Sequence, residues 1–333
     1  MVKSRVASVI IQDGSGGIEV VSKLNTECNI EKINDDIRSG ILGSQYGIFF
    51  RLGRVLSILR NNDVVITNLP MHHMFFSLCN ILYKKKLIGV EHGPWVFVIS
   101  AKSSIVLSWF YHLWLSKSKL PIICVSKDLL AVYNLIRKNN HYIPNCISFI
   151  DNVKTNSLIS DKCKFVFVGR FDYQKDVTLA IESYIAYRKR FGNDCSLELF
   201  GDGSELDALK EHYKREDSIF FHGYNANARN ELYKFDVCLV TSKFEGLPGI
   251  VLEALHVGCR VVCAPFISGL MELSIYPNLI ITNDREIDSF VESTEQILKA
   301  DYEVKQVRTK LETYYSHNKV RQKYSKIISK LNI

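Results

Sequence analysis

The stretch FEGLPGIVLEALHVGCRVV, residues 244–262, joins a Gly/Pro turn to an apolar segment with helical periodicity. Glu245 stands in the turn, and Glu253 lies eight positions further on, inside the apolar segment. A helix that begins near Gly249 has N-terminal N–H groups without partners inside the helix, and its dipole places positive charge there. Such a helix end binds phosphate, and glycines let a ligand approach the backbone closely. The stretch therefore predicts a ligand site.

The two carboxylates of this stretch allow two interpretations. In the first, Glu245 and Glu253 reach one cleft from two depths and bind neutral hydroxyl groups, as on a sugar or a ribose, because carboxylates would repel a phosphate. In the second, Glu245 is an ordinary loop acid and Glu253 faces solvent on the surface of the helix. The stretch alone leaves both open.

The segments around this stretch alternate between apolar runs of strand length and helical patterns. Such alternation predicts βαβ units and a parallel sheet that is covered on both faces. Ligands of these sheets bind outside the carboxyl ends of the strands. The predicted strands of the second half are KFVFVGR (164–170), SLELFG (196–201), IFFHG (219–223), VCLVTS (237–242), RVVCAP (260–265) and NLIITN (278–283).

The first half of the chain shows the same alternation less regularly. Its predicted strands are 5–14, 63–69, 86–93, 121–126 and 146–153, and a helix is predicted at 128–138. A chain of 333 residues is long enough for two domains. We therefore expect an α/β protein with a Rossmann-like domain at 1–152, a second one at 153–315, and a C-terminal helix at 316–333 that packs back toward the first domain.

Two further strand ends in the second half carry groups that suit a diphosphate. The segment GRFDYQK (169–175) places Arg170 and Lys175 in one turn, where two cations can bind phosphates. The alternative is two exposed loop cations. In FGDGSEL (200–206) a strand ends with Gly201 and Gly203 before a helix, which is also the pattern of an ordinary strand–turn–helix.

Together these segments resemble the retaining GT-B-fold glycosyltransferases of the family 4 type, the glycosyl transferases group 1. The resemblance covers residues from about 122 to 300, and its most specific part is the E-x7-E pattern in EGLPGIVLEAL. It implies two Rossmann-like domains that face each other across a cleft. It also implies a nucleotide-diphosphate sugar as donor substrate, with no cofactor and no metal; the chain accordingly contains no Asp-x-Asp motif. The other matching segments are VGRFDYQK, FGDGSELDAL, IFFHGY and SGLMEL (268–273).

The resemblance also implies roles for residues in the second half. Glu253 would bind the hydroxyls of the nucleotide ribose, and Glu245 those of the transferred sugar. Arg170 and Lys175 would neutralise the diphosphate as it leaves. The other implied substrate-binding positions are Gly201, Gly203, Tyr224 beside the base, and the phosphate- or sugar-binding backbone of Gly246, Leu247, Pro248 and Gly249.

In the first half the match to this family is looser. Gly16 and Gly17 in DGSGGIEVVSKL (13–24) would lie under the diphosphate and the acceptor. His92 in VEHGPW (90–95) would lie beside the donor sugar and the reaction centre, although a lone histidine at a strand end can be structural. One departure lies in the second half, where Asp176 follows the lysine at a position where the family often has glycine.

The formal charge of +7 lies entirely in the first half of the chain. Residues 1–152 contain 17 of the 42 Lys and Arg residues but only 10 of the 35 Asp and Glu residues. An anionic partner such as an acidic membrane surface would explain this asymmetry; a basic solvated surface would too. The aromatic segment SSIVLSWFYHLWLSKSK (103–119) fits either a helix in a membrane interface or a core helix.

We therefore expect a metal-independent, retaining glycosyltransferase that acts on a glycan acceptor, expected to be lipid-linked, in bacterial surface polysaccharide biosynthesis of the O-antigen or capsule type. The expected location is the cytoplasm, with peripheral contact to anionic lipid at the inner face of the plasma membrane. The alternative is a non-catalytic protein of the same fold that binds nucleotide sugars or nucleic acid. No basic–aromatic RNA-binding motif is present, so we expect no nucleic-acid partner.

Overall fold

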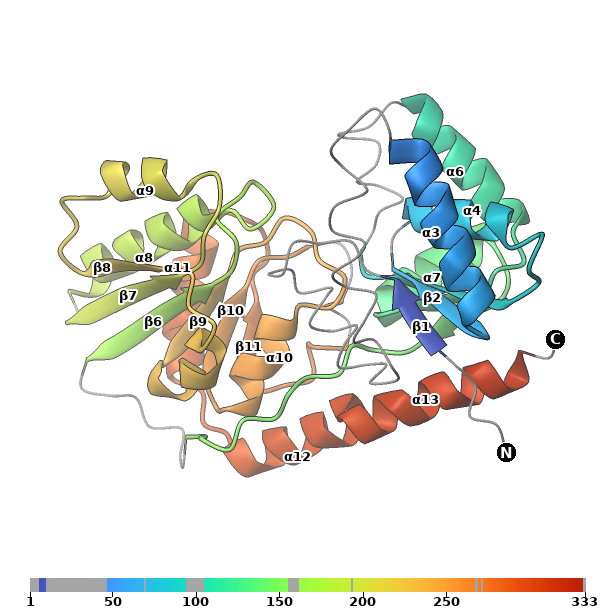
Figure 1. The fold of residues 1–333 in the computed structure, drawn as a ribbon. Helices are drawn as coiled ribbons and strands as arrows, with labels where there is room; N and C mark the ends of the chain where they lie inside the picture. The colour runs from blue at the N-terminus through green and yellow to red at the C-terminus, as the bar shows by residue number, and fades with distance from the viewer. Residues whose placement is uncertain are drawn as a thin grey trace. The chain divides into compact units, whose positions relative to one another are not determined.

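The computed structural model describes residues 6–9, 47–68, 70–93, 105–154, 162–192, 194–266, 269–270 and 272–331. The chain forms two compact units, each built on a parallel sheet (Figure 1). Unit 1 contains the described residues up to Ile147 and those from Tyr315 onward, and unit 2 contains Ser148–Tyr314. The predicted α/β fold with two Rossmann-like domains is confirmed.

Unit 2 has a six-stranded sheet with the order β11-β10-β9-β6-β7-β8, and all its pairs are parallel. Parallel strands need crossover connections, and the order reverses between β8 and β9, so helices cover both faces. The strands are β6 (Cys163–Val168), β7 (Cys195–Phe200), β8 (Ile219–Gly223), β9 (Val237–Val240), β10 (Arg260–Cys263) and β11 (Leu279–Ile281).

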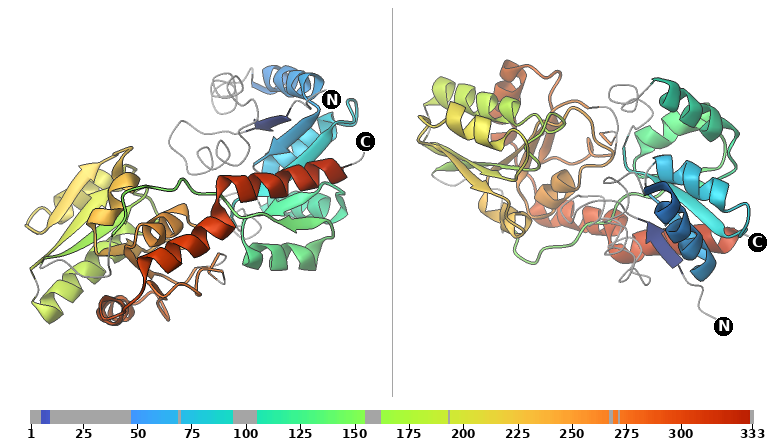
Figure 2. Two further views of the ribbon diagram at one scale, coloured as in Figure 1. Left: turned by 90° about the horizontal axis from the view of Figure 1, so that it is seen from below. Right: turned by 45° about the horizontal axis from the view of Figure 1, so that its top comes forward.

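The helices of unit 2 form two layers on this sheet. The helices α8 and α11 pack together on one face, and α10 packs with the 3-10 helix η1 on the other (Figure 2). Aromatic side chains such as Phe165, Phe171 and Phe290 are fully buried between the layers. The bounds are α8 (Val177–Phe191), α9 (Leu206–His212), η1 (Ala228–Lys234), α10 (Gly249–His256), α11 (Ile287–Leu298) and α12 (Val304–Tyr315).

Unit 1 has a five-stranded parallel sheet with the order β1-β2-β3-β4-β5. Its strands are β1 (Val6–Val9), β2 (Val64–Thr67), β3 (Lys86–Glu91), β4 (Ile122–Cys124) and β5 (Asn140–Tyr142). Its helices are α3 (Gly47–Asn61), α4 (Pro70–Cys79), α6 (Ile105–Lys117), α7 (Lys127–Ile136) and the C-terminal α13 (His317–Lys330). The last of these packs on unit 1, where Lys323 lies 5.3 Å from the ring centroid of Tyr142.

The predicted strand at 146–153 is wrong. These residues form no strand, and the chain pairs instead through β5 at Asn140–Tyr142. The run CISFI is apolar because Cys146 and Ile147 are buried in the connection that leaves unit 1, where the N–H of Ile147 donates to the carbonyl of Tyr315 at 3.2 Å. Burial of a connecting segment produced the pattern of a strand.

The aromatic segment at 103–119 forms α6 from Ile105 onward, and this helix has a buried and an exposed side. Tyr111 and Leu115 are fully buried, whereas Trp109 is 60% exposed and Leu113 38% exposed. Among the described helices, none has both the length and the apolar character that are needed to cross a membrane. One side of the segment therefore belongs to the core of unit 1.

Candidate functional site

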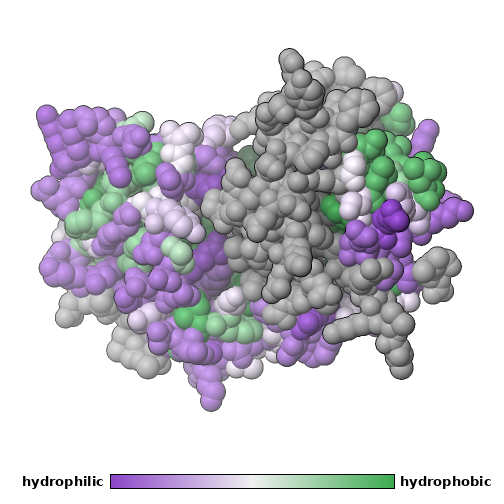
Figure 3. Space-filling view, viewed as in Figure 1, coloured by the Kyte–Doolittle hydropathy of each residue, from purple (hydrophilic) through white to green (hydrophobic). Residues whose placement is uncertain are grey.

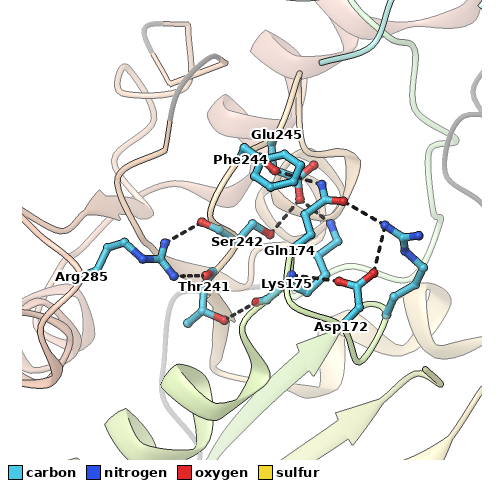
Figure 4. Close-up of polar contacts among 9 residues, drawn as sticks. Asp172, Gln174, Lys175, Thr241, Ser242, Phe244, Glu245 and Arg285 are labelled. Carbon is cyan, nitrogen blue, oxygen red and sulfur yellow. Dashed lines mark hydrogen bonds and ion pairs between the residues drawn. The ribbon is translucent and has the colours of Figure 1, made fainter. Parts of the chain in front are cut away.

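Two loops of unit 2 meet at the carboxyl ends of the neighbouring strands β6 and β9 (Figure 4). Three hydrogen bonds join the loops: the hydroxyl of Thr241 donates to the carbonyl of Lys175 at 2.9 Å, the N–H of Lys243 to the carbonyl of Gln174 at 2.8 Å, and the Gln174 side-chain amide to the carbonyl of Phe244 at 3.0 Å. The segments GRFDYQK and EGLPG are thus brought together where ligands of parallel sheets bind.

Lys175 and Glu245 form an ion pair between these two loops. The Nζ of Lys175 contacts Oε1 of Glu245, and the hydroxyl of Ser242 donates to the same oxygen at 2.8 Å (Figure 4). The two charged side chains are only 20% and 12% exposed. Lys175 is therefore not an exposed loop cation, and the carboxylate of Glu245, which does lie in the loop, faces the junction of the two loops.

Arg170 lies at the outer side of the same loop. Its guanidinium donates to Oε1 of Gln174 at 2.9 Å and pairs with Asp172 at 3.2 Å. The side chain is 49% exposed, so its remaining N–H groups can reach a ligand. Because Gln174 also binds the carbonyl of Phe244, Arg170 is held toward the second loop.

Asp176 has a backbone conformation that glycine adopts more easily than other residues. Its backbone has φ +50°, in the left-handed region that costs most residues about 1–2 kcal/mol. Its carboxylate accepts from Arg285 at 2.7 Å and pairs with Lys243 at 3.6 Å. Arg285 also donates to the carbonyls of Thr241 and Ser242, each at 2.7 Å. This arginine therefore links both loops to the turn that precedes α11. No motif in the sequence pointed to Arg285.

Glu253 is buried on α10, with 8% of its surface exposed. Its Oε1 accepts from the guanidinium of Arg229 on η1 at 2.9 Å, but its Oε2 is buried without a hydrogen-bond partner among the described residues. Burial raises the pKa of Glu253, an effect that Arg229 opposes. The interpretation of Glu253 as a solvent-facing acid is wrong, because the α10 face that carries it packs against η1. Arg229 was not predicted from the sequence.

The Oε2 of Glu253 is one of several buried side-chain atoms without a hydrogen-bond partner among the described residues, and it belongs to a predicted site residue. A buried acceptor without a partner costs about 1–3 kcal/mol and more when it is charged, so few persist in native proteins. Gly249 opens α10 directly above this carboxylate, since a Cβ built there would lie 3.7 Å from Oε1. The N-terminus of α10 and the carboxylate therefore face the same space.

The loop before α10 is packed closely against a second backbone segment. A Cβ at Gly269, which has φ +83°, would lie 2.4 Å from the carbonyl oxygen of Gly246. Leu247 is buried, and Pro248 caps the helix with extended backbone. This packing fixes where the backbone of residues 246–249 lies.

Gly201 and Gly203 have a structural role in the contact between two loops. A Cβ at Gly201 would lie 1.7 Å from the carbonyl oxygen of Gly169, and a Cβ at Gly203 would lie 2.4 Å from that of Phe171. The N–H of Phe171 donates to the carbonyl of Asp202 at 2.9 Å across the same contact. The two glycines let this loop support the loop that carries Arg170, and their contact with substrate stays a prediction.

The remaining predicted site residues lie elsewhere in unit 2, in unit 1 or outside the described residues. Tyr224 follows β8 and is 65% exposed. His92 follows β3 in unit 1, where its Nε2 lies 2.9 Å from the side-chain oxygen of Asn68. Burial and the nearby His73 lower the pKa of His92 to about 3, so the ring is neutral. Gly16 and Gly17 lie outside the described residues.

A buried polar network lies next to His92 in unit 1. Glu91, fully buried at the end of β3, accepts from the hydroxyl of Tyr111 at 2.8 Å and lies 3.4 Å from Nε2 of His73. The other ring nitrogen of His73 lies 2.6 Å from the hydroxyl of Thr67. Sequence reasoning missed this network, which fixes the strand end that carries His92.

Residues 149–316 match the family model of the glycosyl transferases group 1. The chain belongs to this family. The match covers half of the chain and nearly all of unit 2, which contains the loops described above.

Similar proteins include bacterial glycosyltransferases of glycan assembly. The N-acetylgalactosamine-N,N'-diacetylbacillosaminyl-diphospho-undecaprenol 4-alpha-N-acetylgalactosaminyltransferase of Campylobacter jejuni is 30% identical over 153 residues, which is 44% of this chain and only 40% of that enzyme. The O-antigen biosynthesis glycosyltransferase WbnH of Escherichia coli is 25% identical over 310 residues, which is 85% of this chain and 88% of that one.

Solved structures share the fold over the whole chain. Anabaena HepE in complex with UDP and glucose gives a TM-score of 0.76 at 16% identity, covering 99% of this chain and 100% of that one. The apo form of the lipopolysaccharide outer core galactosyltransferase WaaB gives 0.69 at 17% identity, covering 98% and 99%. The chain therefore has the GT-B fold.

Proposed function

We propose that this glycosyltransferase moves a sugar from a nucleotide-diphosphate sugar to a hydroxyl of a glycan acceptor, with retention at the anomeric carbon. The main observation in support of a nucleotide-sugar donor is the buried Oε2 of Glu253. This atom has no partner among the described residues and lies near the N-terminus of α10. Two ribose hydroxyls can donate to such a carboxylate. The adjacent helix end and the cations Arg170 and Lys175 suit the diphosphate that is joined to the ribose.

The chemistry requires stabilisation of a leaving diphosphate. Cleavage of the bond between the sugar and the phosphate builds negative charge on the diphosphate oxygens. Preplaced donors that meet this charge lower the barrier, because they need no reorganisation during the reaction. Arg170, Lys175 and the first N–H groups of α10 can supply these donors, and Glu245 can accept from hydroxyls of the transferred sugar. We propose that these groups take the place of a divalent metal.

The acceptor class is inferred from the relatives. WbnH acts in O-antigen biosynthesis, and the name of the Campylobacter enzyme contains a diphospho-undecaprenol acceptor. We propose that the acceptor of this chain is likewise a lipid-linked glycan of bacterial surface polysaccharide assembly. Whether the transferred sugar is a hexose or an N-acetylhexosamine is decided by the donor assay that follows.

Incubation with UDP-, GDP-, ADP- and dTDP-sugars should release free nucleotide with one of these donors in the presence of a lipid-linked acceptor. The rate should be unchanged by EDTA, since the proposed charge stabilisation comes from side chains and amides. Loss of turnover with EDTA and its rescue by manganese would contradict the metal-free mechanism. Thermal stabilisation by a nucleotide sugar without any turnover would instead favour a non-catalytic binding protein.

Arg170→Ala should lower kcat about 10²-fold and leave the free energy of unfolding nearly unchanged. The activity falls because one charge-assisted contact to the leaving group is lost. Stability is kept because the side chain is 49% exposed and surface ion pairs contribute little. Steady-state kinetics and urea unfolding measure the two effects. Arg188→Ala is the matched control, since Arg188 is 43% exposed and also ion-paired; equal activity of both variants would remove Arg170 from the mechanism.

A further inference from the structure

Unit 1 presents large apolar side chains to solvent on two adjacent helices. Leu78 near the end of α4 is 55% exposed, and Ile81 and Leu82 in the following turn are 70% and 78% exposed. On the neighbouring α6, Trp109 is 60% and Leu113 38% exposed. Figure 3 shows hydrophobic surface over this part of unit 1, with hydrophilic residues beside it. These five residues, with Lys84, Lys85 and Lys117, are called the apolar–lysine surface.

The turn that carries Ile81 and Leu82 is held in its outward position. The side-chain amide of Asn80 donates to the carbonyl of Lys85 at 2.7 Å, and its oxygen accepts from the N–H of Lys85 at 2.8 Å. Lys84 has φ +49° between them, which closes the turn tightly. Because the Asn80 side chain binds both the N–H and the carbonyl of Lys85, the turn cannot rearrange to bury Ile81 and Leu82 against the core. These two side chains therefore stay in contact with solvent.

The helix α6 has apolar residues on its exposed side as well as on its buried side. Tyr111 and Leu115 supply the buried side, while Trp109, Leu113 and Lys117 recur every four residues on the exposed side. A helix that is apolar all round is normally buried all round. Contiguous exposed apolar surface of this kind marks a site of interaction.

Lysines outnumber acids around this surface. Lys84, Lys85 and Lys86 line a hollow of about 330 Å³ together with Ser118 after α6. Between residues 70 and 127 the sequence contains one acid, Glu91, and this side chain is fully buried. Asp63 lies 3.9 Å from Lys85 and offsets part of the charge. Apolar side chains with a rim of lysines complement the acyl boundary and the anionic headgroups of a bilayer.

We propose that the apolar–lysine surface binds the headgroup region of an anionic lipid bilayer. Ile81, Leu82 and Trp109 enter the interface, and Lys84 and Lys117 contact the headgroups. The proposal rests on the proposed function in one respect: a lipid-linked acceptor places the substrate at a membrane. It deepens that function because it assigns the contact to α4, its following turn and α6 rather than to the basic half as a whole.

Vesicle co-sedimentation of the full chain tests the proposal. The parent should bind vesicles of equal phosphatidylglycerol and phosphatidylcholine more tightly than pure phosphatidylcholine, and salt should weaken binding as the Debye length falls from ~8 Å to ~3 Å. Ile81→Ser with Leu82→Ser should weaken partitioning at least about tenfold. Lys84→Glu with Lys117→Glu should weaken it about 25-fold or more at low salt, since each lysine near an anionic surface is worth about fivefold.

Matched changes in unit 2 serve as controls. Phe220→Ser alters a partly exposed apolar residue there, and Lys189→Glu with Lys210→Glu makes the same change of charge at two exposed positions. These variants should bind vesicles like the parent. Equal loss in the controls, or unchanged binding in both test variants, overturns the proposal.

Two further measurements, of oligomeric state and of turnover, distinguish this proposal from its alternatives. If the parent does not bind vesicles and instead forms dimers that Ile81→Ser with Leu82→Ser dissociates, the surface joins two copies and the lipid proposal is overturned. Turnover of a water-soluble acceptor should be kept in all four variants. Absence of turnover in the parent with intact vesicle binding would count against the proposed function and leave the lipid surface supported.

Discussion

Lys175→Met is expected to lower kcat about 10³-fold, the upper range for loss of one transition-state donor. The substitution removes a cation from the edge of the sheet where the diphosphate is proposed to leave. It also leaves Glu245, only 12% exposed, without its positive partner, so that a bare carboxylate faces the same space. Both consequences oppose the development of negative charge on the leaving group. Single-turnover kinetics with the donor found in the nucleotide-sugar panel measure the effect.

Lys154→Met is the matched control for this prediction. Lys154 is 12% exposed and forms an ion pair with Asp236 at 2.7 Å, away from the two loops of the site. Both lysine variants should lose stability, because each removes the cationic partner of a largely buried acid, but the Lys154 variant should keep its kcat. Combining Lys175→Met with Glu245→Gln should restore stability without restoring activity. Recovery of normal turnover in that double variant would reduce the role of Lys175 to neutralising Glu245.

The sequence predicted the parts of the fold that depend on local pattern. Apolar runs followed by glycine or polar residues located the strands of unit 2, and the segments GRFDYQK and EGLPG follow two strands that the structure places side by side. The failed strand at 146–153 has the same local pattern, and only its burial in a connection between the units distinguishes it. Periodicity reports burial, and burial alone does not decide whether a segment pairs in a sheet.

The contacts within the site depend on positions far apart in the chain, and this is why they were missed. Arg285 binds Asp176 across 109 positions, and Arg229 binds Glu253 across 24. Neither arginine belongs to a motif: Arg229 lies on η1, and Arg285 lies in the turn before α11.

Glu253→Gln is expected to lower kcat/KM for the donor about 10³-fold, because a carboxylate that accepts from two ribose hydroxyls loses two charge-assisted hydrogen bonds of about 1.5–3 kcal/mol each. An amide offers one acceptor oxygen, and its NH2 group would meet a second donor. Thermal-shift titration with the nucleoside diphosphate should show the same loss of affinity. Unchanged affinity would remove Glu253 from the ribose site.

The same substitution should stabilise the protein without ligand, and this gain should depend on pH. Burial raises the pKa of Glu253, so the folded state disfavours the ionised form. Its contribution to stability is therefore full below the pKa of the unfolded chain, near ~4.3, and is lost as pH rises through the higher folded pKa. Glu253→Gln removes this loss, so its melting temperature should exceed that of the parent near neutral pH and approach it in acid. Loss of the ion pair with Arg229 should reduce this gain in stability only slightly. The Arg229 side chain is 41% exposed, so it stays hydrated in the variant.

Glu312→Gln provides a control of opposite sign. A hydrogen bond from Arg308 lowers the pKa of Glu312, so this acid contributes stability above the pKa of the unfolded chain and loses it as pH falls. Its replacement should slightly lower the melting temperature near neutral pH and leave donor affinity unchanged. If Glu253→Gln instead lowered stability at neutral pH like Glu312→Gln, the carboxylate would be satisfied by the fold itself. A stability gain joined to a loss of donor affinity means that the protein keeps a costly buried charge because the ribose hydroxyls bind it.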